Sequence, residues 1–384
     1  MRYAARAGWI GLLVVLLACQ SAGSTPPPAA PKATTVTSPV PAAPAAPAAT
    51  TAPAAAARPA QAAMPAPLVP PVPVRVGVLS SVSDSGVYIG LDRGYYRELG
   101  LDLQVETIPD PNAISTLTGT NQLDVGGFGV NINPFQAAAR GIGMKMVADK
   151  GSLRPGFGYA ALLGRQDLMD SGQLRSPADI RGRTISKLAP CDSSDPWFER
   201  LFQRGGFSRD DIEFSLMPFP DVTAALANKA VDLGWQIEPL VTLATERGIA
   251  TRWIGAEEIY PNQQVAVIFY SPEFVGRTDA AQRFMIAYVR SLRDYNDAFG
   301  KGRGRAEVAQ ILAKYTTVKD LALYDKMIPA GLDPDGRLNV EGMRDDLNVF
   351  VRLGCITPDL ADVGRVVDES FVNYAVSVLG PYQP

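Results

Sequence analysis

Hydrophobic and polar positions follow the same order in two stretches of the chain, residues 114–141 and 222–248. Each stretch begins with a short amphipathic helix, passes through a polar turn and an Asp, and continues into an apolar strand. The strand opens into a loop that carries an aromatic residue, Phe128 or Trp235, and the next helix ends at a Gly, which favours a helix C-cap. Two such units predict two similar α/β lobes, although any α/β protein can contain two look-alike units by chance.

The pattern before the first unit predicts a β-α-β arrangement. Residues 74–79 alternate as a strand and break into a polar loop at 80–86. A helix is expected over 87–99, ending at Gly100, and a second strand over 101–107. This is the repeating unit of a parallel sheet, in which loops at the carboxyl ends of the strands form the ligand crevice.

Several segments in this order resemble one family. They are GYYRELGLD at 94–102, TLTGTNQLDVGGFG at 116–129, LRSPADIRGRTIS at 174–186 and WQIEP at 235–239. Together they resemble the solute-binding proteins of the nitrate, sulfonate and taurine class of ABC importers, which share a fold with thiamine-pyrimidine synthases. In that family the Trp directly precedes the Glu, whereas here it stands three places before it. The likeness covers residues 74 to about 298.

This resemblance implies an α/β fold of the type II periplasmic-binding class, with two lobes, each a central sheet flanked by helices. The chain would cross between the lobes near 159–165 and again near 265–271, and its tail would form amphipathic helices over 280–298 and 361–379. The expected domains are a signal peptide at 1–19, a Pro/Ala-rich tether at 20–73, lobe one at 74–165 plus 265–384, and lobe two at 166–264.

The N-terminus has the pattern of an export signal: two Arg, a short apolar run and then Leu-Leu-Ala-Cys ending at Cys19. The segment resembles a bacterial lipobox, which implies that Cys19 is acylated; the alternative is an ordinary signal cut near Ala22. Residues 20–73 are almost wholly Pro, Ala, Thr, Ser and Val, so they are expected to form an extended tether. We therefore expect a lipid-anchored, extracytoplasmic protein, periplasmic or on the outer face of a cell membrane.

Charge limits the partners of the folded part. All 39 Asp and Glu lie after residue 73, together with 32 of the 36 Lys and Arg, so this part carries a net charge of −7. An acidic body argues against nucleic acid as a partner. No later stretch approaches the length of a transmembrane helix. We expect a monomer whose partners are a small-molecule ligand, the permease of an ABC transporter and the lipid bilayer.

The chain has no His and, besides Cys19, only Cys191 and Cys355. Common zinc sites and nucleophile pairs that need His therefore cannot be built, and no metal or cofactor is expected. The thiamine-pyrimidine synthases rely on a His and a Cys-rich motif, so we expect a binding protein rather than an enzyme. An isolated Cys pair outside the cytoplasm is either one disulfide or two buried thiols. We favour two thiols, because Cys191 and Cys355 fall in different lobes.

The ligand is expected between the lobes, in contact with loops at strand ends. For some residues a structural role is equally plausible: Asp195 and Glu238 could cap helices, and Phe128 and Trp235 could be core residues. The candidate ligand-binding residues are Ser81, Ser83, Asp84, Tyr88, Gly127, Phe128, Asn131, Asp192, Ser193, Ser194, Asp195, Trp235 and Glu238.

The charges of these loops favour one class of ligand. Four carboxylates, those of Asp84, Asp192, Asp195 and Glu238, stand against Lys187 alone. Such loops predict a negative field, which favours a neutral or cationic heterocycle stacked on an aromatic residue. A sulfonate, taurine or nitrate anion is the alternative, because helix N-termini can bind anions through backbone amides.

Overall fold

A computed structural model describes residues 61–383 of the 384-residue chain. The predicted signal peptide, Cys19 and residues 20–60 of the predicted tether lie outside the described residues. Within 61–383, no helix is both long enough and apolar enough to cross a membrane.

Lobe one is built on a five-stranded sheet with the order β2-β1-β3-β10-β4. β1 pairs in parallel with β2 and β3, whereas β10 runs antiparallel to both β3 and β4. The strands are β1 (Val72–Val78), β2 (Leu101–Thr107), β3 (Val125–Gly129), β4 (Lys145–Ser152) and β10 (Gln264–Tyr270).

Lobe two repeats this design in a second five-stranded sheet with the order β7-β6-β8-β5-β9. β6 pairs in parallel with β7 and β8, and β5 runs antiparallel to β8 and β9. The strands are β5 (Ala160–Arg165), β6 (Thr184–Lys187), β7 (Glu213–Leu216), β8 (Leu233–Ile237) and β9 (Ala250–Gly255).

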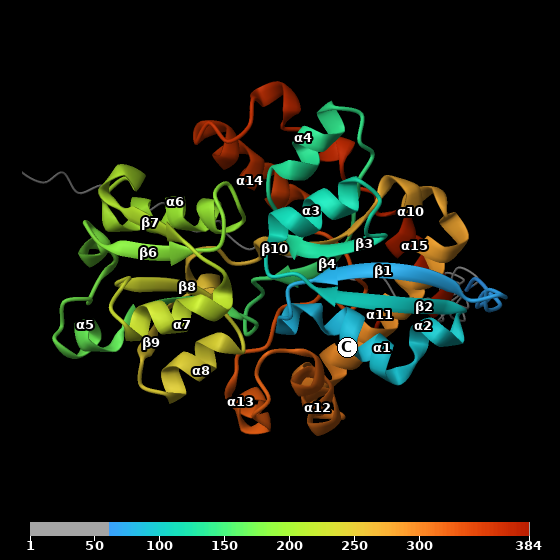
Figure 1. The fold of residues 1–384 in the computed structure, drawn as a ribbon, viewed down its shortest axis with the longest axis horizontal. Coiled ribbons are helices and arrows are strands. Elements are labelled where there is room, and N and C mark those ends of the chain that lie inside the picture. Colours follow the sequence, from blue (N-terminus) through green and yellow to red (C-terminus); the bar gives the residue numbers. More distant parts are fainter. Residues whose placement is uncertain (1–60, 384) are drawn as a thin grey trace, which may run out of the picture. The chain divides into compact units, whose positions relative to one another are not determined.

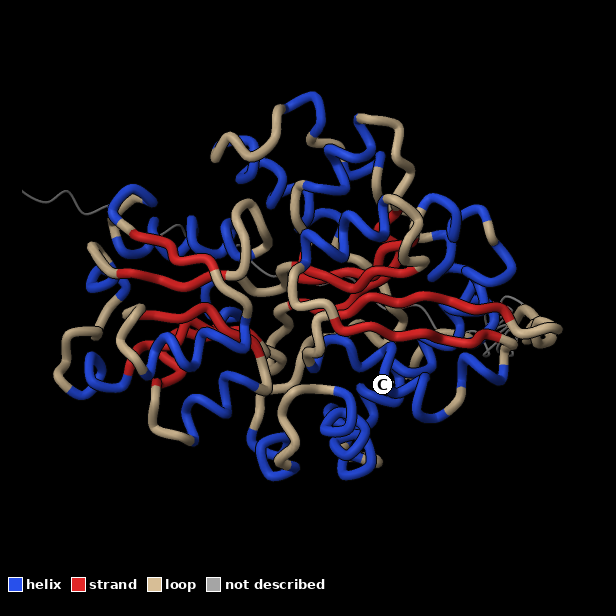
Figure 2. Tube along the Cα trace, viewed as in Figure 1, coloured by secondary structure: helices blue, strands red, loops and turns tan. Residues whose placement is uncertain are grey.

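Helices cover both faces of each sheet (Figures 1 and 2). Lobe one has α1 (Ser85–Arg93), α2 (Tyr95–Glu98), α3 (Pro111–Gly119), α4 (Asn133–Ala139), α10 (Pro272–Gly276), α11 (Thr278–Lys301), α12 (Arg305–Tyr315), α13 (Leu321–Lys326), α14 (Val340–Arg352) and α15 (Ser370–Leu379). Lobe two has α5 (Gln166–Asp170), α6 (Ser194–Gly205), α7 (Phe219–Ala227), α8 (Leu240–Glu246) and α9 (Ala256–Ile259). The predicted two-lobed α/β fold is confirmed.

The two sequence units occupy equivalent places in the two sheets. Residues 114–141 fall within the series α3, β3, α4, and residues 222–248 within α7, β8, α8. β3 and β8 each lie between the first parallel strand of their sheet and its antiparallel strand. The hydrophobic pattern therefore identified a true structural repeat.

The antiparallel strand of each sheet is the one that follows a crossing between the lobes. The chain leaves lobe one after β4 and enters lobe two as β5, and it returns from α9 to lobe one as β10. Residues 160–165, which the sequence analysis placed in lobe one, therefore pair with β8 and β9 of lobe two. An apolar extended run does not reveal which sheet it joins, because either sheet would bury it.

Two predicted helices are shorter than expected. The helix predicted over 87–99 is divided into α1 and α2 at Gly94, whose φ of 77° is left-handed and ends α1. The helix predicted over 361–379 begins only at Ser370. The residues before it form a short 3-10 turn over Val363–Arg365, because the Asp362 side chain accepts from the Gly364 N–H and caps that turn separately.

Residues 61–71, predicted as the end of the tether, lie against lobe one. The N–H of Ala62 donates to the carbonyl of Ser377 (2.9 Å), and the N–H of Leu68 donates to the carbonyl of Leu99 (3.2 Å). β1 then begins at Val72. The extended conformation that Pro-rich composition favours is compatible with such packing, because it leaves backbone groups free to bond a neighbouring surface.

The expectation of two free thiols is wrong, because Cys191 and Cys355 form a disulfide with an S–S distance of 2.03 Å and a Cα–Cα distance of 5.8 Å. Cys191 lies between β6 and α6 of lobe two, whereas Cys355 follows α14 of lobe one. Their assignment to different lobes was correct, but it did not separate them in space. The bond therefore joins the lobes covalently.

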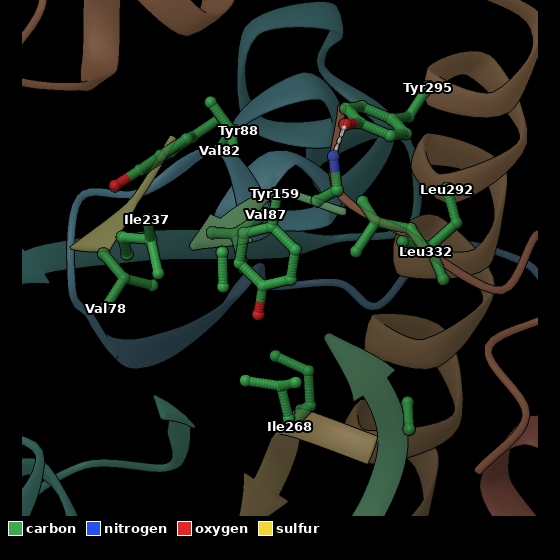
Figure 3. Close-up of a cluster of buried hydrophobic side chains, with 14 of the residues drawn as sticks. Val78, Val82, Val87, Tyr88, Tyr159, Ile237, Ile268, Leu292, Tyr295 and Leu332 are labelled. Atoms are coloured by element: carbon green, nitrogen blue, oxygen red, sulfur yellow. Dashed lines mark hydrogen bonds between the residues drawn. The ribbon is translucent and has the colours of Figure 1, made fainter. Parts of the chain in front are cut away.

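The largest core cluster contains buried residues of both lobes. Figure 3 shows a part in which Tyr88 and Tyr159 lie near Val78 and Ile237. In the same view, the Tyr295 hydroxyl accepts a hydrogen bond from the backbone of residue 330 (2.8 Å). Buried aromatic residues thus continue up to the region where the strand ends of the two lobes approach each other.

Candidate functional site

A cavity of about 40 Å³ lies between the strand ends of the two lobes. Lobe one contributes residues that follow β1 and β3, and lobe two contributes the loop after β6 and the end of β8. The lining residues of the cavity are Leu79, Ser81, Ser83, Pro111, Gly129, Asn131, Lys150, Tyr159, Leu188, Asp192, Ser193, Ser194, Phe219, Trp235, Ile237, Val265 and Ala266.

Seven of the thirteen candidate ligand-binding residues line this cavity, and they come from both lobes. Six of them lie in loops that follow a strand or at the start of the next helix, and Trp235 lies within β8. The seven are Ser81, Ser83, Asn131, Asp192, Ser193, Ser194 and Trp235.

In lobe one, a buried Lys-Asp pair stands beside the cavity. Lys150 Nζ lies 2.9 Å from Asp84 Oδ1 and donates to Ser83 Oγ (2.9 Å), and both charged side chains are at most 1 % exposed. Asp84 Oδ2 accepts from the backbone N–H of Ser81 (2.8 Å). The candidate Gly127 makes room for this pair, because a Cβ there would lie 2.8 Å from Lys150 Cε. We call Ser81, Ser83, Asp84 and Lys150 the lobe-one charge cluster.

Lobe two has a larger buried group of charges. Lys187 Nζ lies 2.5 Å from Asp195 Oδ1 and 3.6 Å from Asp192 Oδ1, and Arg209 Nη1 lies 2.7 Å from Asp195 Oδ1. Burial raises the pKa of Asp192, and the nearby Lys187 ammonium opposes this effect. We call Lys187, Asp192, Asp195 and Arg209 the lobe-two charge cluster.

These contacts do not support the negative field that the loops predicted. Each cluster contains as many cations as carboxylates, because Lys150 and Arg209 supply charges that the loop inventory omitted. Lys150 lies on β4, far along the chain from Asp84, and Arg209 reaches Asp195 from the short 3-10 turn Arg209–Asp211. The carboxylates therefore already have partners within the protein.

Three further candidates have structural contacts away from the cavity. Glu238 accepts from the N–H and hydroxyl of Thr242 (both 3.0 Å), as the helix-capping alternative predicted, and burial raises its pKa. Phe128 stacks on Phe269 in the core of lobe one, with ring centroids 4.0 Å apart. Tyr88 stacks on Tyr315 (5.1 Å), and burial raises the pKa of its hydroxyl.

Trp235 has both of the roles considered for it. Its ring packs on Trp197, with centroids 4.6 Å apart, and it also forms part of the cavity wall. Phe219, Ile237 and Tyr159 extend this apolar wall, and none of the three was among the candidate residues. Among the cavity residues that were not candidates, Lys150 is the one with a recognisable feature, because it is a charged residue in the almost fully buried strand β4.

Comparison with protein families shows a match of residues 82–297, more than half of the chain, to the family described as NMT1/THI5 like. No match is found among curated proteins.

Solved structures share the fold at low sequence identity. The periplasmic nitrate-binding protein of Synechocystis PCC 6803 aligns with a TM-score of 0.68 and 13% identity, covering 82% of this chain and 90% of its own. The ligand-binding component of an ABC-type import system from Staphylococcus aureus gives 0.66 and 13%, covering 79% and 99%. The alkanesulfonate-binding protein of Xanthomonas axonopodis pv. citri gives 0.62 and 19%, covering 78% and 99%. The resemblance drawn from the sequence is confirmed at the level of family and fold.

Proposed function

Because the chain belongs to the NMT1/THI5-like family, we propose that it is an extracytoplasmic solute-binding protein that delivers a small molecule to the permease of an ABC importer. Structural relatives described as binding components of import systems support this proposal. The cavity supports it as well, because both lobes contribute walls to it. A ligand held by two lobes stabilises their closed arrangement, which is a form that a permease can recognise.

The polar groups that remain free around the cavity favour a ligand with hydrogen-bond acceptors. Within residues 61–383, Asn131 Nδ2 and Ser193 Oγ have no hydrogen-bond partner, and both residues line the cavity. The carboxylates of Asp84, Asp192 and Asp195 are already paired. This is the observation on which the choice of ligand rests: the site offers donors and has no free carboxylate.

Helix ends support the same choice. Ser193 and Ser194 lie at the start of α6, and the first residues of α3 and α7, Pro111 and Phe219, also line the cavity. The N-terminus of a helix carries a partial positive charge and favours anions or acceptor oxygens. The proposed ligand is therefore a small organic sulfonate or carboxylate, with its oxygens at Asn131 and Ser193 and its apolar body against the aromatic wall.

A neutral flat heterocycle is the second candidate, and the aromatic residues Trp235, Phe219 and Tyr159 around the cavity favour it. Stacking on such a wall contributes on the order of 1 kcal/mol. A cationic heterocycle has no such support, because it would need a carboxylate without a protein partner.

One substitution separates the ligand classes. Asn131→Asp keeps the side-chain oxygen that accepts from the Asn133 N–H (3.0 Å) but replaces the free amide donor by negative charge. Binding of ethanesulfonate, measured by isothermal titration, should weaken at least about tenfold, because a like charge then faces the anion. Asn133→Asp, two residues away and outside the cavity lining, is the matched control and should change affinity little.

A ligand panel decides between the candidates. Ethanesulfonate, taurine and nitrate are titrated beside 4-aminopyrimidine and a purine. Heat from the heterocycles alone, strengthened by Asn131→Asp, would refute the acceptor ligand and favour a cation. Absence of binding by every member of the panel would count against the solute-binding role itself.

A binding role also agrees with the chemistry of the residues. The chain contains no His, and its two described Cys residues form a disulfide, so the His and Cys-rich motif that the thiamine-pyrimidine synthases need is missing. The charged groups at the cavity pair with one another, which leaves no free carboxylate to act as a base. We therefore assign capture and release, without a chemical step.

Membrane attachment through Cys19 is part of the same proposal. The apolar run that ends in Leu-Leu-Ala-Cys, and the Pro/Ala-rich residues that follow, are its support. Cys19→Ser should release the protein into the soluble fraction and leave ligand affinity unchanged. A Cys19→Ser protein that stays with the membrane after a carbonate wash would exclude this anchor.

A further inference from the structure

The loop of residues 188–194, which we call the ligand loop, connects β6 to α6 in lobe two but is fastened to lobe one. Four of its residues, Leu188, Asp192, Ser193 and Ser194, line the cavity. Cys191, in the middle of the loop, is bonded to Cys355 just after α14 of lobe one. The part of lobe two that faces the ligand is thus covalently attached to the other lobe.

Non-covalent contacts hold the same loop. Gln263, which immediately precedes β10, donates through Nε2 to the carbonyl of Ser193 (2.7 Å). The same Nε2 donates to Asp346 Oδ2 on α14 (3.2 Å). On the cavity side, Asn131 of lobe one and Asp192 form an isolated antiparallel bridge. Two residues that follow Cys191 in the ligand loop are therefore held as well, Asp192 by Asn131 of lobe one and Ser193 by Gln263 of the second crossing.

This arrangement limits how the lobes can move. Two-lobed proteins open by rotation about the segments that cross between the lobes, here residues 153–159 and 260–263. During such a rotation, the ligand loop would have to move away from α14 together with lobe two. The bond between Cys191 and Cys355 permits no such separation, since it keeps their Cα atoms near 5.8 Å. Wide opening of the cleft therefore requires either that the disulfide breaks or that the ligand loop detaches from lobe two and remains with lobe one.

The bond is accessible to chemistry. Both Cys191 and Cys355 are only partly buried, whereas the charged side chains next to the loop, Lys187 and Asp195, are at most 1 % exposed. Each cysteine of the pair is thus partly exposed to solvent, whereas the Lys187–Asp195 pair of the charge cluster beside the loop is not. Thiol-disulfide exchange depends on such access.

We propose that the Cys191–Cys355 bond fastens the ligand loop to lobe one and presets the cleft in its closed arrangement, so that solute affinity depends on the redox state of this pair. In the switching step, a dithiol gives two electrons and two protons to the disulfide. The S–S bond breaks, two thiols form on Cys191 and Cys355, and the dithiol becomes a disulfide. The proposal concerns regulation of the site described above and rests on the proposed function for its affinity readout.

A measurement that needs no ligand tests the fastening directly. The full chain carrying Cys19→Ser, in which Cys191 and Cys355 are the only cysteines, is compared before and after treatment with dithiothreitol by hydrogen–deuterium exchange. Amides of residues 188–194 should exchange about tenfold faster after reduction, because local opening no longer requires the bond to break. Unchanged exchange in this loop would overturn the proposal.

Affinity gives the second readout. With ethanesulfonate as the probe, reduction should weaken binding about tenfold if the closed fraction falls from nearly all molecules to about a tenth. The double variant Cys191→Ser/Cys355→Ser should match the reduced protein and show no further response to dithiothreitol. Equal affinity of the oxidised and reduced proteins would refute redox control of the site.

The outcomes separate this proposal from the proposed function. If ethanesulfonate binds neither form while loop exchange still rises on reduction, the fastening stands and the ligand assignment fails. Far-UV circular dichroism accompanies the double variant. Reduction of the protein followed by alkylation with iodoacetamide gives the same comparison without any substitution, so misfolding of the variant would not obscure the result.

Discussion

The two charge clusters that flank the cavity achieve neutrality in different ways. In the lobe-one cluster, Asp84 has a single cationic partner, Lys150, and both side chains are almost fully buried. In the lobe-two cluster, Asp195 has two, Lys187 and Arg209, and the Arg209 side chain is one-third exposed. Both clusters have a net charge of zero, although they lie at equivalent places in the two lobes and are built differently. Asp195 would keep a cationic partner if one were removed, whereas Asp84 would not. We expect this redundancy to determine how each cluster responds to substitution.

The largest effect is expected where no second cation exists. Lys150→Met leaves the Asp84 carboxylate buried without a countercharge, which should lower the free energy of unfolding by about 3 to 5 kcal/mol. Urea denaturation followed by circular dichroism measures this loss. Lys145→Met on the same strand is the matched control, because Lys145 is half-buried and donates only to the carbonyl of Arg365 (2.7 Å).

A double variant tests the cause of that loss. Adding Asp84→Asn to Lys150→Met removes the uncompensated charge, so stability should recover to within about 2 kcal/mol of the unaltered protein. If the double variant is as unstable as Lys150→Met alone, lost packing rather than charge explains the effect.

Asp346 is a buried carboxylate that belongs to neither cluster and, within residues 61–383, has no cation in direct contact, so it provides a third case for the comparison. It lies on α14 near Gln263, Tyr260, Arg200 and Asp345, and burial raises its pKa to about 7. The folded protein thus keeps this proton at pH values where the unfolded chain, with its ordinary pKa near 3.8, has lost it. Stability from this group is complete below pH 4 and is lost as pH rises towards 7.

This titration can be measured as a slope of stability against pH. Asp346 should account for a fall of about 3 kcal/mol in the free energy of unfolding between pH 4.5 and 7.5, and Asp346→Asn should remove this contribution. Glu341→Gln, an exposed position on the same helix, serves as the control. A slope that survives in Asp346→Asn would assign the titration to another group, of which Asp149, whose pKa burial raises to about 6, is the first to examine.

Lys187→Met tests the redundancy of lobe two. Arg209 remains 2.7 Å from Asp195 Oδ1, and Asp192 still accepts from the N–H of Ser194 (2.9 Å). The loss of unfolding free energy should therefore be about 1.5 kcal/mol, well below that of Lys150→Met. Equal losses in the two variants would show that Arg209 does not substitute for the buried ammonium.

The smallest effect is expected for Arg209→Gln. This side chain is partly exposed, and Lys187 remains 2.5 Å from Asp195, so the cost should be about 0.5 to 1 kcal/mol and should shrink in high salt. Denaturation at low and at high sodium chloride measures both quantities. A salt-independent loss above that of Lys187→Met would contradict this ranking.

The parts of the fold that depend on short sequence patterns could be predicted from the sequence. The repeated units around β3 and β8 have a clear hydrophobic period, and the polar segments after strands contain six of the candidate residues in the cavity wall. The charge balance around the cavity could not be predicted, because it depends on pairing between strands that are far apart in the sequence. Lys150 reaches Asp84 only because β4 joins the sheet through β10, and no short pattern contains that information.

The sequence also contained no indication of which residues of the two lobes lie close together. Cys191 and Cys355 are 164 residues apart, and their assignment to separate lobes argued for separate thiols. The argument failed because both lie at the junction of the lobes, where α14 approaches the start of α6. The lining residues Tyr159 and Val265 escaped notice for a related reason: they belong to the crossing region, whose apolar pattern resembles that of any buried strand.

The place of β10 in the sheet of lobe one has a consequence for synthesis. β10 lies between β3 and β4, yet it is translated only after all five strands of lobe two. When residues up to 255 have emerged from the ribosome, the second sheet has all its strands, whereas β4 still lacks its neighbour in the first. Lobe one is therefore synthesised first but completed last. The strand β4, which contains the buried Lys150, can pair with β10 only after more than a hundred further residues have been translated.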